Sequence, residues 1–291
     1  MQIMSRPLFG LALGGGGARG LAHNGVLKVL ESEGFRPDCL AGTSMGAIIA
    51  ALYASGMTPE TIRKEAGQMG KLSSVVKLVA DDFNFDYALS ADTVQEYLRE
   101  ILGKCTEFSH LQIPLAVATV DVRNAREVAL QEGDLAKAIN ASMALPGVAE
   151  PVEWDGMRLA DGGSLNNVPV DLARSMGTQV VVAVDVSPDV TNERFWKEQR
   201  VPEIAAASWR SNAIMVANIT AAKMRRARVD LVIRPDIPAN ITTLAGFKYV
   251  DQLVDCGSEA ALKALPELRI LLKARISFRS HKLKSASPAQ L

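Results

Sequence analysis

The segment Gly42-Thr43-Ser44-Met45-Gly46 constrains the fold of this chain more than any other part of the sequence. It follows the pattern Gly-x-Ser-x-Gly, in which a strand turns sharply into a helix and a serine stands at the turn. The flanks fit, because residues 35–41 are typical of an incoming strand and residues 47–54 of the start of a helix. The pattern predicts an accessible Ser44 hydroxyl, although a glycine-bordered turn with an incidental serine would have the same sequence.

Apolar runs typical of buried strands alternate along the chain with helical segments. We expect strands at residues 8–13, 35–41, 114–120, 126–130, 179–186 and 230–234. We expect helices at residues 19–33, 47–54 and 134–143. Strands that alternate with helices form a mostly parallel sheet with helices on both faces. The sequence therefore predicts an α/β protein with three α/β/α layers.

The 291 residues show no internal repeat, no low-complexity linker and no break in composition between the motifs. We therefore predict one domain over residues 1–280, followed by a polar tail at residues 281–291. Helical insertions are expected near residues 57–102 and 193–228. The first insertion carries an apolar run at residues 75–79 and aromatic residues at Phe83, Phe85 and Tyr87. It is either a helical cap over one sheet edge or a lid whose apolar side meets an acyl chain.

Charge and cysteine content exclude several classes of protein. The 32 basic and 32 acidic residues balance, so no electrostatic attraction to nucleic acid or to a strongly anionic membrane is indicated. The three cysteines are widely spaced and form no pattern of a metal or disulfide site, which favours a cytoplasmic setting. Residues 39–59 carry no charge, but their glycines and serines fit a strand, a turn and a buried helix better than a membrane span.

A run of four glycines, Gly14 to Gly17, follows the first expected strand directly. Their backbone amides at the start of a helix can bind a phosphate or an oxyanion. The spacing Gly15-x-Gly17-x-x-Gly20 also satisfies a dinucleotide-binding pattern, with Asp38 near the spacing of a ribose-binding acid. Asp38 precedes or begins the second strand, however, whereas the ribose-binding acid belongs at its end. That end is instead followed by the Gly-x-Ser-x-Gly turn at residues 42–46, which we call the elbow.

The histidines of the chain decide between two mechanisms. A serine triad of the α/β-hydrolase type needs a histidine after its acid in chain order. After Asp161, which stands in Asp161-Gly162-Gly163, the sequence offers only His281 in the polar tail. His110 precedes a strand, and His23 is most simply a packed helix residue. Asp161 can itself be a plain Asp-Gly turn, but a Ser–Asp dyad fits the residues that the sequence supplies.

Three segments together resemble the bacterial patatin-like phospholipases, a family of serine acyl hydrolases. In the family's order they are Gly15-Gly16-Gly17-Ala18-Arg19-Gly20, Gly42-Thr43-Ser44-Met45-Gly46 and Asp161-Gly162-Gly163. Residues 141–147 are similar to the family's segment ahead of the acid, and residues 161–169 to its run D-G-G-x-x-N-N-x-P. The resemblance covers about residues 8 to 190. The combination of motifs is specific, although no single motif is.

The resemblance implies a role for each matching position. Ser44 becomes the nucleophile and Asp161 the base, and the amides of Gly15, Gly16 and Gly17 become the oxyanion donors. Arg19 matches the family's basic position, where it either steadies the glycine loop or attracts an anionic head group. The remaining motif glycines are Gly20, Gly42, Gly46, Gly162 and Gly163. The resemblance also implies a reaction without a cofactor or a metal.

These observations predict a serine esterase that hydrolyses acyl esters of phospholipids or related lipids, of the phospholipase A or lysophospholipase type. Burial beside an apolar acyl site is expected to raise the pKa of Asp161 and to make it a better base. The expected partner is a lipid substrate, with no nucleic acid. A cytoplasmic protein with transient contact at the inner membrane face fits this prediction. The alternatives are a dinucleotide-dependent oxidoreductase, a non-catalytic lipid-binding regulator on the same fold, and acyl transfer to an acceptor other than water.

Overall fold

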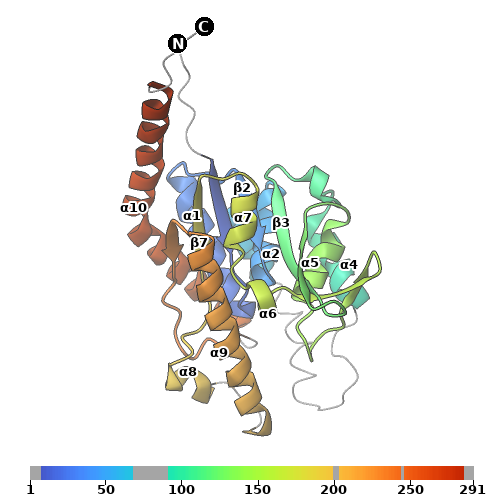
Figure 1. Cartoon of the computed structure of the whole chain (residues 1–291). Helices are drawn as coiled ribbons and strands as arrows, with labels where there is room; N and C mark the ends of the chain where they lie inside the picture. The colour runs from blue at the N-terminus through green and yellow to red at the C-terminus, as the bar shows by residue number, and fades with distance from the viewer. Residues whose placement is uncertain (1–7, 68–90, 199–202, 244–245, 285–291) are drawn as a thin grey trace.

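A computed structural model describes residues 8–67, 91–198, 203–243 and 246–284 of the chain. A central sheet lies between layers of helices, as Figure 1 shows. Within the described residues the sheet has eight strands. They are β1 (Phe9–Leu13), β2 (Cys39–Gly42), β3 (Leu115–Asp121), β4 (Arg126–Leu130), β5 (Val152–Trp154), β6 (Met157–Asp161), β7 (Val180–Val184) and β8 (Leu231–Ile233). The predicted three-layer α/β/α fold is confirmed.

The strands follow the order β5-β6-β3-β2-β1-β7-β8, with β4 paired to β3. The five strands β3, β2, β1, β7 and β8 are parallel to one another. Strands β4 and β6 pair antiparallel with β3, and β5 pairs antiparallel with β6. The helices are α1 (Ala22–Ser32), α2 (Met45–Ala54), α4 (Ala91–Leu102), α5 (Leu135–Met143), α6 (Gly163–Asn166), α7 (Val170–Ser175), α8 (Glu193–Glu198), α9 (Glu203–Arg226) and α10 (Val250–Lys284). Short 3₁₀ helices are η1 (Gly17–Leu21), η2 (Phe108–His110) and η3 (Phe247–Tyr249).

Side-chain size differs between the two faces of the sheet. Leu11, Leu13 and Leu40 belong to the larger core cluster, which includes residues of α1, α2, α5 and α10. Their neighbours Ala12 and Ala41 point the other way, into a smaller cluster with residues of α7 and Met224 of α9. Successive residues of a strand face opposite sides, so this alternation assigns one face to each helical layer. Alanines on the second face leave room for the short α7 to pack close to the sheet.

Strands β2 and β6 lie end to end along one edge of β3. Val117 of β3 pairs with both β2 and β4, and Thr119 pairs with both β4 and β6. A residue in a strand has only two edges, so β2 and β6 share the edge opposite β4. Gly42 at the end of β2 is aligned with Val117, and Asp161 at the end of β6 with Thr119. The carboxyl ends of β2 and β6 therefore lie opposite positions of β3 that are only two residues apart.

The predicted elements are present, with shifted ends. The first predicted helix divides into η1 and α1, and the predicted strand at residues 35–41 narrows to β2. The expected strand at residues 126–130 is β4, paired antiparallel with β3. The hairpin of β5 and β6 was missed, although its loop Asp155-Gly156 carries a recognisable signal. Both loop residues have positive φ, at 46° and 77°, as a two-residue type I′ turn requires.

The two predicted insertions contain helices where they are described. Residues 59–67 are helical and α4 follows at Ala91–Leu102, while α8 and α9 occupy the second insertion. The apolar run at residues 75–79 and the aromatics Phe83, Phe85 and Tyr87 lie outside the described residues. Helix α10 continues to Lys284, past residue 281 where the sequence placed the start of a polar tail. Among the described helices, none combines the length and hydropathy needed to cross a membrane.

Candidate active site

Ser44 stands at the turn between β2 and α2, as the sequence predicts. Its backbone has φ 54° and ψ −125°, a conformation that costs a residue with a side chain about 1–3 kcal/mol. It is the N-cap of α2, and its side chain is partly exposed between buried neighbours. The positive end of the α2 dipole, which favours negative charge, therefore lies at this serine.

Close backbone contact explains the glycine after the serine. A Cβ on Gly46 would overlap the carbonyl oxygens of Leu13 and Gly14. The turn is tied to β1 at the same place, because the Thr43 amide donates to the Leu13 oxygen at 3.2 Å. Gly42, the first glycine of the motif, packs against the backbone of Ala47 in the same way. The motif therefore seats the elbow directly on the end of β1, where the glycine loop begins.

Asp161 ends β6 and faces Ser44. Burial raises the pKa of Asp161 from 3.8 to about 6, while hydrogen bonds from the Gly163 amide and the Ser44 side chain act to lower it. The Gly163 amide donates to the carboxylate at 2.7 Å. Gly162 is needed for the approach, since a Cβ there would overlap the Ala118 carbonyl oxygen of β3. The structure thus brings together Ser44 and Asp161, which are 117 positions apart in the sequence.

The glycine loop lies against the elbow, but its amides are not equivalent. The Gly15 amide donates to the carbonyl oxygen of Asn167 at 2.9 Å. The amides of Gly16 and Gly17 have no acceptor among the residues that the structure describes. Gly17 has φ 53°, in the region that favours glycine. Gly20 follows in η1 and leaves room for the Met45 side chain. The predicted oxyanion donors therefore divide into one engaged amide and two free ones.

His23 is fully buried, and its ring bonds to the backbone at the start of the glycine loop. Its Nε2 lies 2.7 Å from the Gly14 carbonyl oxygen, which requires the neutral tautomer that carries the proton on Nε2. Burial lowers the pKa of His23 to about 4, so the ring is neutral at physiological pH. This agrees with the expectation of a packed helix histidine.

Arg19 points into the protein. Its guanidinium donates to the carbonyl oxygens of Val186 at 2.9 Å and Ile241 at 3.1 Å. It also lies over the ring of Phe195, at 5.6 Å from the centroid. Burial lowers its pKa to about 10. These bonds join η1 to the segments after β7 and β8, which favours the loop-steadying role over attraction of a head group.

Asp38 is not placed to hold a ribose. It accepts a hydrogen bond from the Phe9 amide at 2.7 Å, at the start of β1. The glycine loop follows the end of β1, so the two features lie at opposite ends of the same strand. A dinucleotide needs both at the carboxyl ends of the strands. The dinucleotide-binding alternative is therefore not favoured.

Three residues that hold the site together were not assigned a role from the sequence. Ser142 of α5 accepts the Ser44 amide at 2.8 Å and donates to the Ala118 oxygen at 2.7 Å. Asn167 donates to Ser187 at 3.1 Å while its backbone oxygen holds the Gly15 amide. Asn166 accepts the Thr43 hydroxyl at 2.8 Å through its backbone oxygen. These residues lie within residues 141–147 and 161–169, whose match to family segments indicated that they belong to the site. The match does not show which atoms they contact.

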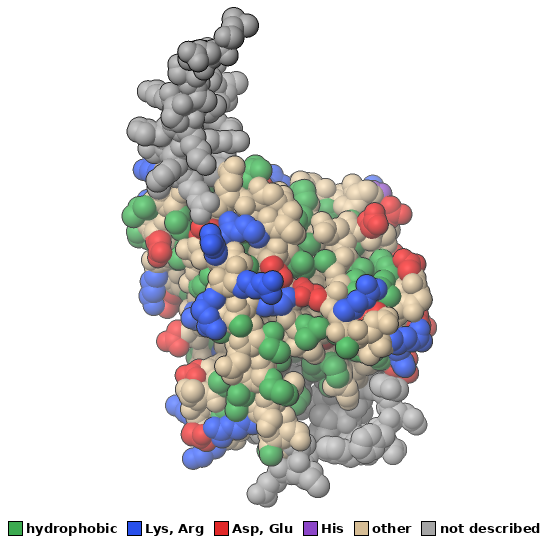
Figure 2. Space-filling view, viewed as in Figure 1, with side chains coloured by type: hydrophobic (Ala, Val, Ile, Leu, Met, Phe, Trp, Pro, Cys, Tyr) green, Lys and Arg blue, Asp and Glu red, His purple; other side chains and the backbone are tan. Residues whose placement is uncertain are grey.

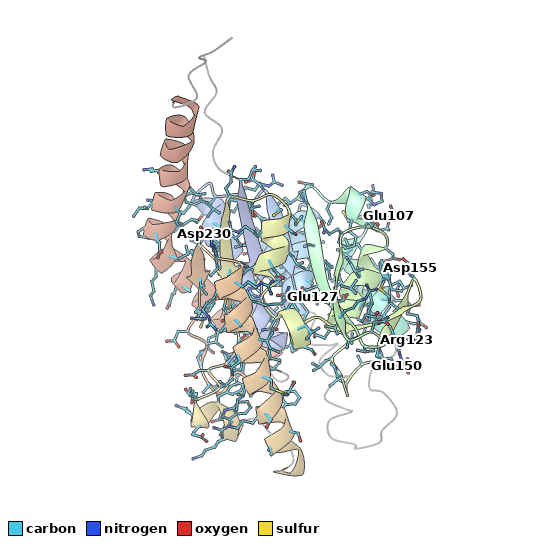
Figure 3. All side chains as sticks on the ribbon, in the orientation of Figure 1. Glu107, Arg123, Glu127, Glu150, Asp155 and Asp230 are labelled. Atoms are coloured by element: carbon cyan, nitrogen blue, oxygen red, sulfur yellow. The ribbon has the colours of Figure 1, made fainter. Side chains whose placement is uncertain are left out.

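Asn166 also joins a charged cluster beside the site. Its amide nitrogen donates to Glu127 and, at 2.7 Å, to Asp171. Lys223 of α9 forms ion pairs with the same two carboxylates, the one to Asp171 at 3.2 Å. Figure 3 shows Glu127 close to α6 and α9, and Figure 2 shows basic and acidic side chains next to one another on this face. The cluster anchors α6, and through it the residue before Ser44.

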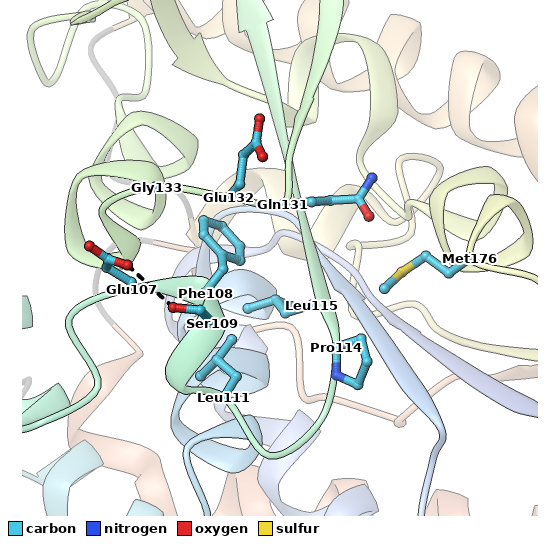
Figure 4. A pocket seen from close by; sticks show the side chains of 10 residues that line it. All are labelled: Glu107, Phe108, Ser109, Leu111, Pro114, Leu115, Gln131, Glu132, Gly133 and Met176. Carbon is cyan, nitrogen blue, oxygen red and sulfur yellow. Dashed lines mark hydrogen bonds between the residues drawn. The ribbon is translucent and has the colours of Figure 1, made fainter.

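A groove of about 380 Å³ lies elsewhere, at the start of β3 (Figure 4). Phe108, Leu111, Pro114, Leu115 and Met176 contribute its apolar surface, and Glu107 and Glu132 its charges. Gly42, two residues before Ser44, is aligned with Val117, and Asp161 with Thr119, both in the middle of β3 rather than at its start. The groove is therefore separate from the candidate site. Within the described chain, no group of three or more His, Cys, Asp or Glu residues is arranged to hold a metal ion.

Comparison with known proteins identifies the family of the chain. Residues 11–174 match the family model described as patatin-like phospholipase, and the chain belongs to this family. It is similar to patatin-like phospholipase domain-containing protein 6 of Homo sapiens, with 36% identity over 198 residues, or 66% of this chain and 14% of that protein.

A second relative is an uncharacterised NTE family protein of Mycobacterium tuberculosis. It is 32% identical over 213 residues, which are 69% of this chain and 58% of that protein. The chain therefore spans less than two thirds of either relative. Among solved structures, VipD from Legionella pneumophila matches with a TM-score of 0.41 and 14% identity, over 86% of this chain and 67% of that one.

Proposed function

We propose that this protein is a serine esterase that hydrolyses acyl esters of lipids, with Ser44 as nucleophile and Asp161 as base. The observation that supports it most directly is the pairing of a strained serine at the elbow with a buried carboxylate whose pKa is raised to about 6. A base with a pKa near neutrality is ionised at pH 7 and still accepts a proton readily. The membership of the patatin-like phospholipase family supports the same activity.

The reaction proceeds in two halves. Asp161 accepts the hydroxyl proton of Ser44 as the serine oxygen attacks the ester carbonyl, whose oxygen takes up the negative charge. When the tetrahedral intermediate collapses, the alcohol leaves with the proton from Asp161 and the acyl group stays on Ser44. Asp161 then deprotonates a water molecule that attacks the acyl-enzyme. When this second intermediate collapses, the bond from the acyl carbon to the Ser44 oxygen breaks, Asp161 returns the proton to that oxygen, and the fatty acid is released.

We assign the oxyanion-donor role to the amides of Gly16 and Gly17, which have no acceptor among the described residues. Gly15 serves as a third donor only if its bond to Asn167 opens. The Met45 amide, at the first position of α2, has no acceptor among the described residues and follows the nucleophile directly. Removal of one such donor typically lowers the rate by about 10²–10³.

The substrate class is part of the proposal. We infer a phospholipid or lysophospholipid, because the family description names phospholipases. Arg19 is engaged inside the fold, so head-group recognition is not assigned to it. Contact with a membrane surface would be transient and peripheral. Nucleic acid is not expected as a partner, since the formal charge of the chain is zero.

The test combines labelling with turnover. An alkyl fluorophosphonate should label the wild-type protein at Ser44, and an ester series of increasing chain length should be hydrolysed. The Ser44→Ala variant should lose both while it melts at a similar temperature. The matched control is Ser55→Ala, since Ser55 lies at the other end of α2 and its hydroxyl donates to the Leu52 oxygen. This variant should keep both the labelling and the turnover.

Two outcomes would redirect the proposal. Turnover that survives Ser44→Ala would contradict the nucleophile. A folded wild-type protein with no label and no turnover would support the non-catalytic regulator. Analysis of the products, with and without an added alcohol acceptor, separates hydrolysis from acyl transfer.

A further inference from the structure

Ser142 occupies a position that a backbone hydrogen bond would normally fill. In the parallel pair of β2 and β3, the Leu40 amide donates to the Pro114 oxygen at 2.9 Å. Each further bond of such a ladder lies two residues along both strands. Continued to the elbow, the ladder would join the Ser44 amide to the Ala118 oxygen. The Ser142 hydroxyl stands between these two atoms, at 2.8 Å from the amide and 2.7 Å from the oxygen.

We propose that Ser142 is a positioning residue for the acylation of Ser44: its inserted hydroxyl holds the end of β2 away from β3, so that Ser44 faces Asp161. The inference rests on the proposed role of Ser44 as nucleophile. A hydroxyl suits the position because it accepts one hydrogen bond and donates another. Ser142 is fully buried and Ala118 is buried with it, so both bonds are shielded from solvent.

The same end of α5 also holds the acid. The Asp161 amide donates to the Ala144 oxygen at 3.0 Å, two residues beyond Ser142. Residues 142–144 therefore bind the backbone amide of the proposed nucleophile and that of the proposed base. Helix α5 is itself fixed at its start, where the Asp134 side chain accepts the Lys137 amide at 2.8 Å. One rigid element sets the position of Ser44 relative to Asp161.

Loss of the Ser142 hydroxyl has a specific consequence. The Ser44 amide and the Ala118 oxygen would lose their partners in a buried place, where unpaired polar groups are unfavourable. The simplest repair is the direct bond between them, which draws Ser44 toward β3. This movement displaces the Ser44 hydroxyl from its place opposite the Asp161 carboxylate. Ser142 itself takes no part in bond making, so binding of the ester should change little.

The experiment compares Ser142→Ala with Ser142→Thr, which keeps the hydroxyl, on a short-chain ester well below each melting temperature. Ser142→Ala should lower kcat and the rate of fluorophosphonate labelling at least tenfold, with KM within about twofold. The acid limb of its pH profile should move to higher pH, since the hydrogen bond from Ser44 that lowers the pKa of Asp161 is weakened. Ser142→Thr should retain more of the rate than Ser142→Ala.

Thr178→Val is the matched control. The Thr178 hydroxyl is also buried and donates to a backbone oxygen, that of Ala173 at 2.8 Å, but it contacts Gly10 in β1 rather than the elbow. The control should keep kcat even where it lowers the melting temperature. If Ser142→Ala does not fold, Ser142→Cys replaces it, and its weaker hydrogen bonds should give a smaller loss of kcat at constant KM.

Three results would overturn the positioning role: a wild-type rate in Ser142→Ala or its cysteine replacement, a loss confined to KM, or an equal loss of kcat in Thr178→Val. Each of these three results counts against the positioning role only when Ser44→Ala is inactive. Activity in Ser44→Ala would instead defeat the proposed function itself, so the two failures are distinguishable.

Discussion

Replacement of Asp161 by asparagine should remove activity and stabilise the fold at the same time. The carboxylate is buried, and its pKa rises from 3.8 to about 6 on folding. A pKa raised by folding means that the folded state favours the protonated acid. Its stabilising contribution is complete below about pH 4 and is lost as the pH rises through about 6. At pH 8 the wild-type protein therefore folds against the cost of a buried charge.

The size of the effect follows from the two pKa values. A rise from 3.8 to about 6 corresponds to about 3 kcal/mol at 25 °C. Asparagine has nearly the same shape and carries no charge at any pH. It can still accept the Gly163 amide and donate to Ser44. At pH 4 the unfolded acid is already more than half ionised, so the free energy of unfolding of Asp161→Asn, relative to wild type, should increase by about 2.5 kcal/mol between pH 4 and pH 8. For a chain of 291 residues this is a change of about 4 °C in melting temperature.

Urea denaturation followed by tryptophan fluorescence at pH 4, 6 and 8 measures this difference, and ester turnover measures the loss of activity. Asp189→Asn is a control with the opposite sign, because a hydrogen bond from Thr191 lowers the pKa of Asp189. The ionised Asp189 carboxylate therefore stabilises the folded protein at neutral pH, and this stabilisation is lost in acid. A stability difference for Asp161→Asn that is independent of pH, or that grows toward acid, would refute the reasoning. Retained turnover would assign the base to another residue.

Two further predictions concern the same chemistry. The rate kcat/KM on a water-soluble ester should rise through an apparent pKa of about 6, so that at pH 5 it is about one tenth of its plateau; a profile flat down to pH 4.5 would contradict Asp161 as base. His23→Gln should lower kcat less than tenfold in the same assay, because the neutral His23 ring bonds to the Gly14 oxygen and glutamine also carries a donor. Complete loss of turnover with a retained fold would restore a histidine mechanism.

The sequence predicts those parts of the site that depend on local geometry. The glycines around Ser44 and after Asp161 are recognisable because they stand in short motifs, although the backbone oxygens that Gly46 and Gly162 approach belong to other strands. The alternation of strands and helices follows from hydrophobic periodicity, which is also local. The raised pKa of Asp161 was predicted in direction, because an acid beside an apolar acyl site is expected to be buried.

The remaining features depend on contacts between distant segments. Nothing within residues 141–147 indicates that the Ser142 hydroxyl would insert between β2 and β3, since that depends on the register of two other elements. The bond from Gly15 to Asn167 likewise joins segments far apart in the chain. Arg19 was ambiguous for the same reason, because its acceptors at Val186 and Ile241 lie beyond the motifs. A motif match assigns a residue type to a place, but not the partners that the fold supplies.

The alignment of β2 and β6 on a common strand limits how the protein can change in length. Loops between Ser44 and Asp161 can grow or shrink without altering the distance between the two side chains, because that distance is measured along β3. One residue inserted between Val117 and Thr119 would instead separate them by a further ~3.3 Å and turn the following side chains to the other face. Strand β3 contributes no reacting group, yet it should tolerate fewer insertions than the loops between Ser44 and Asp161.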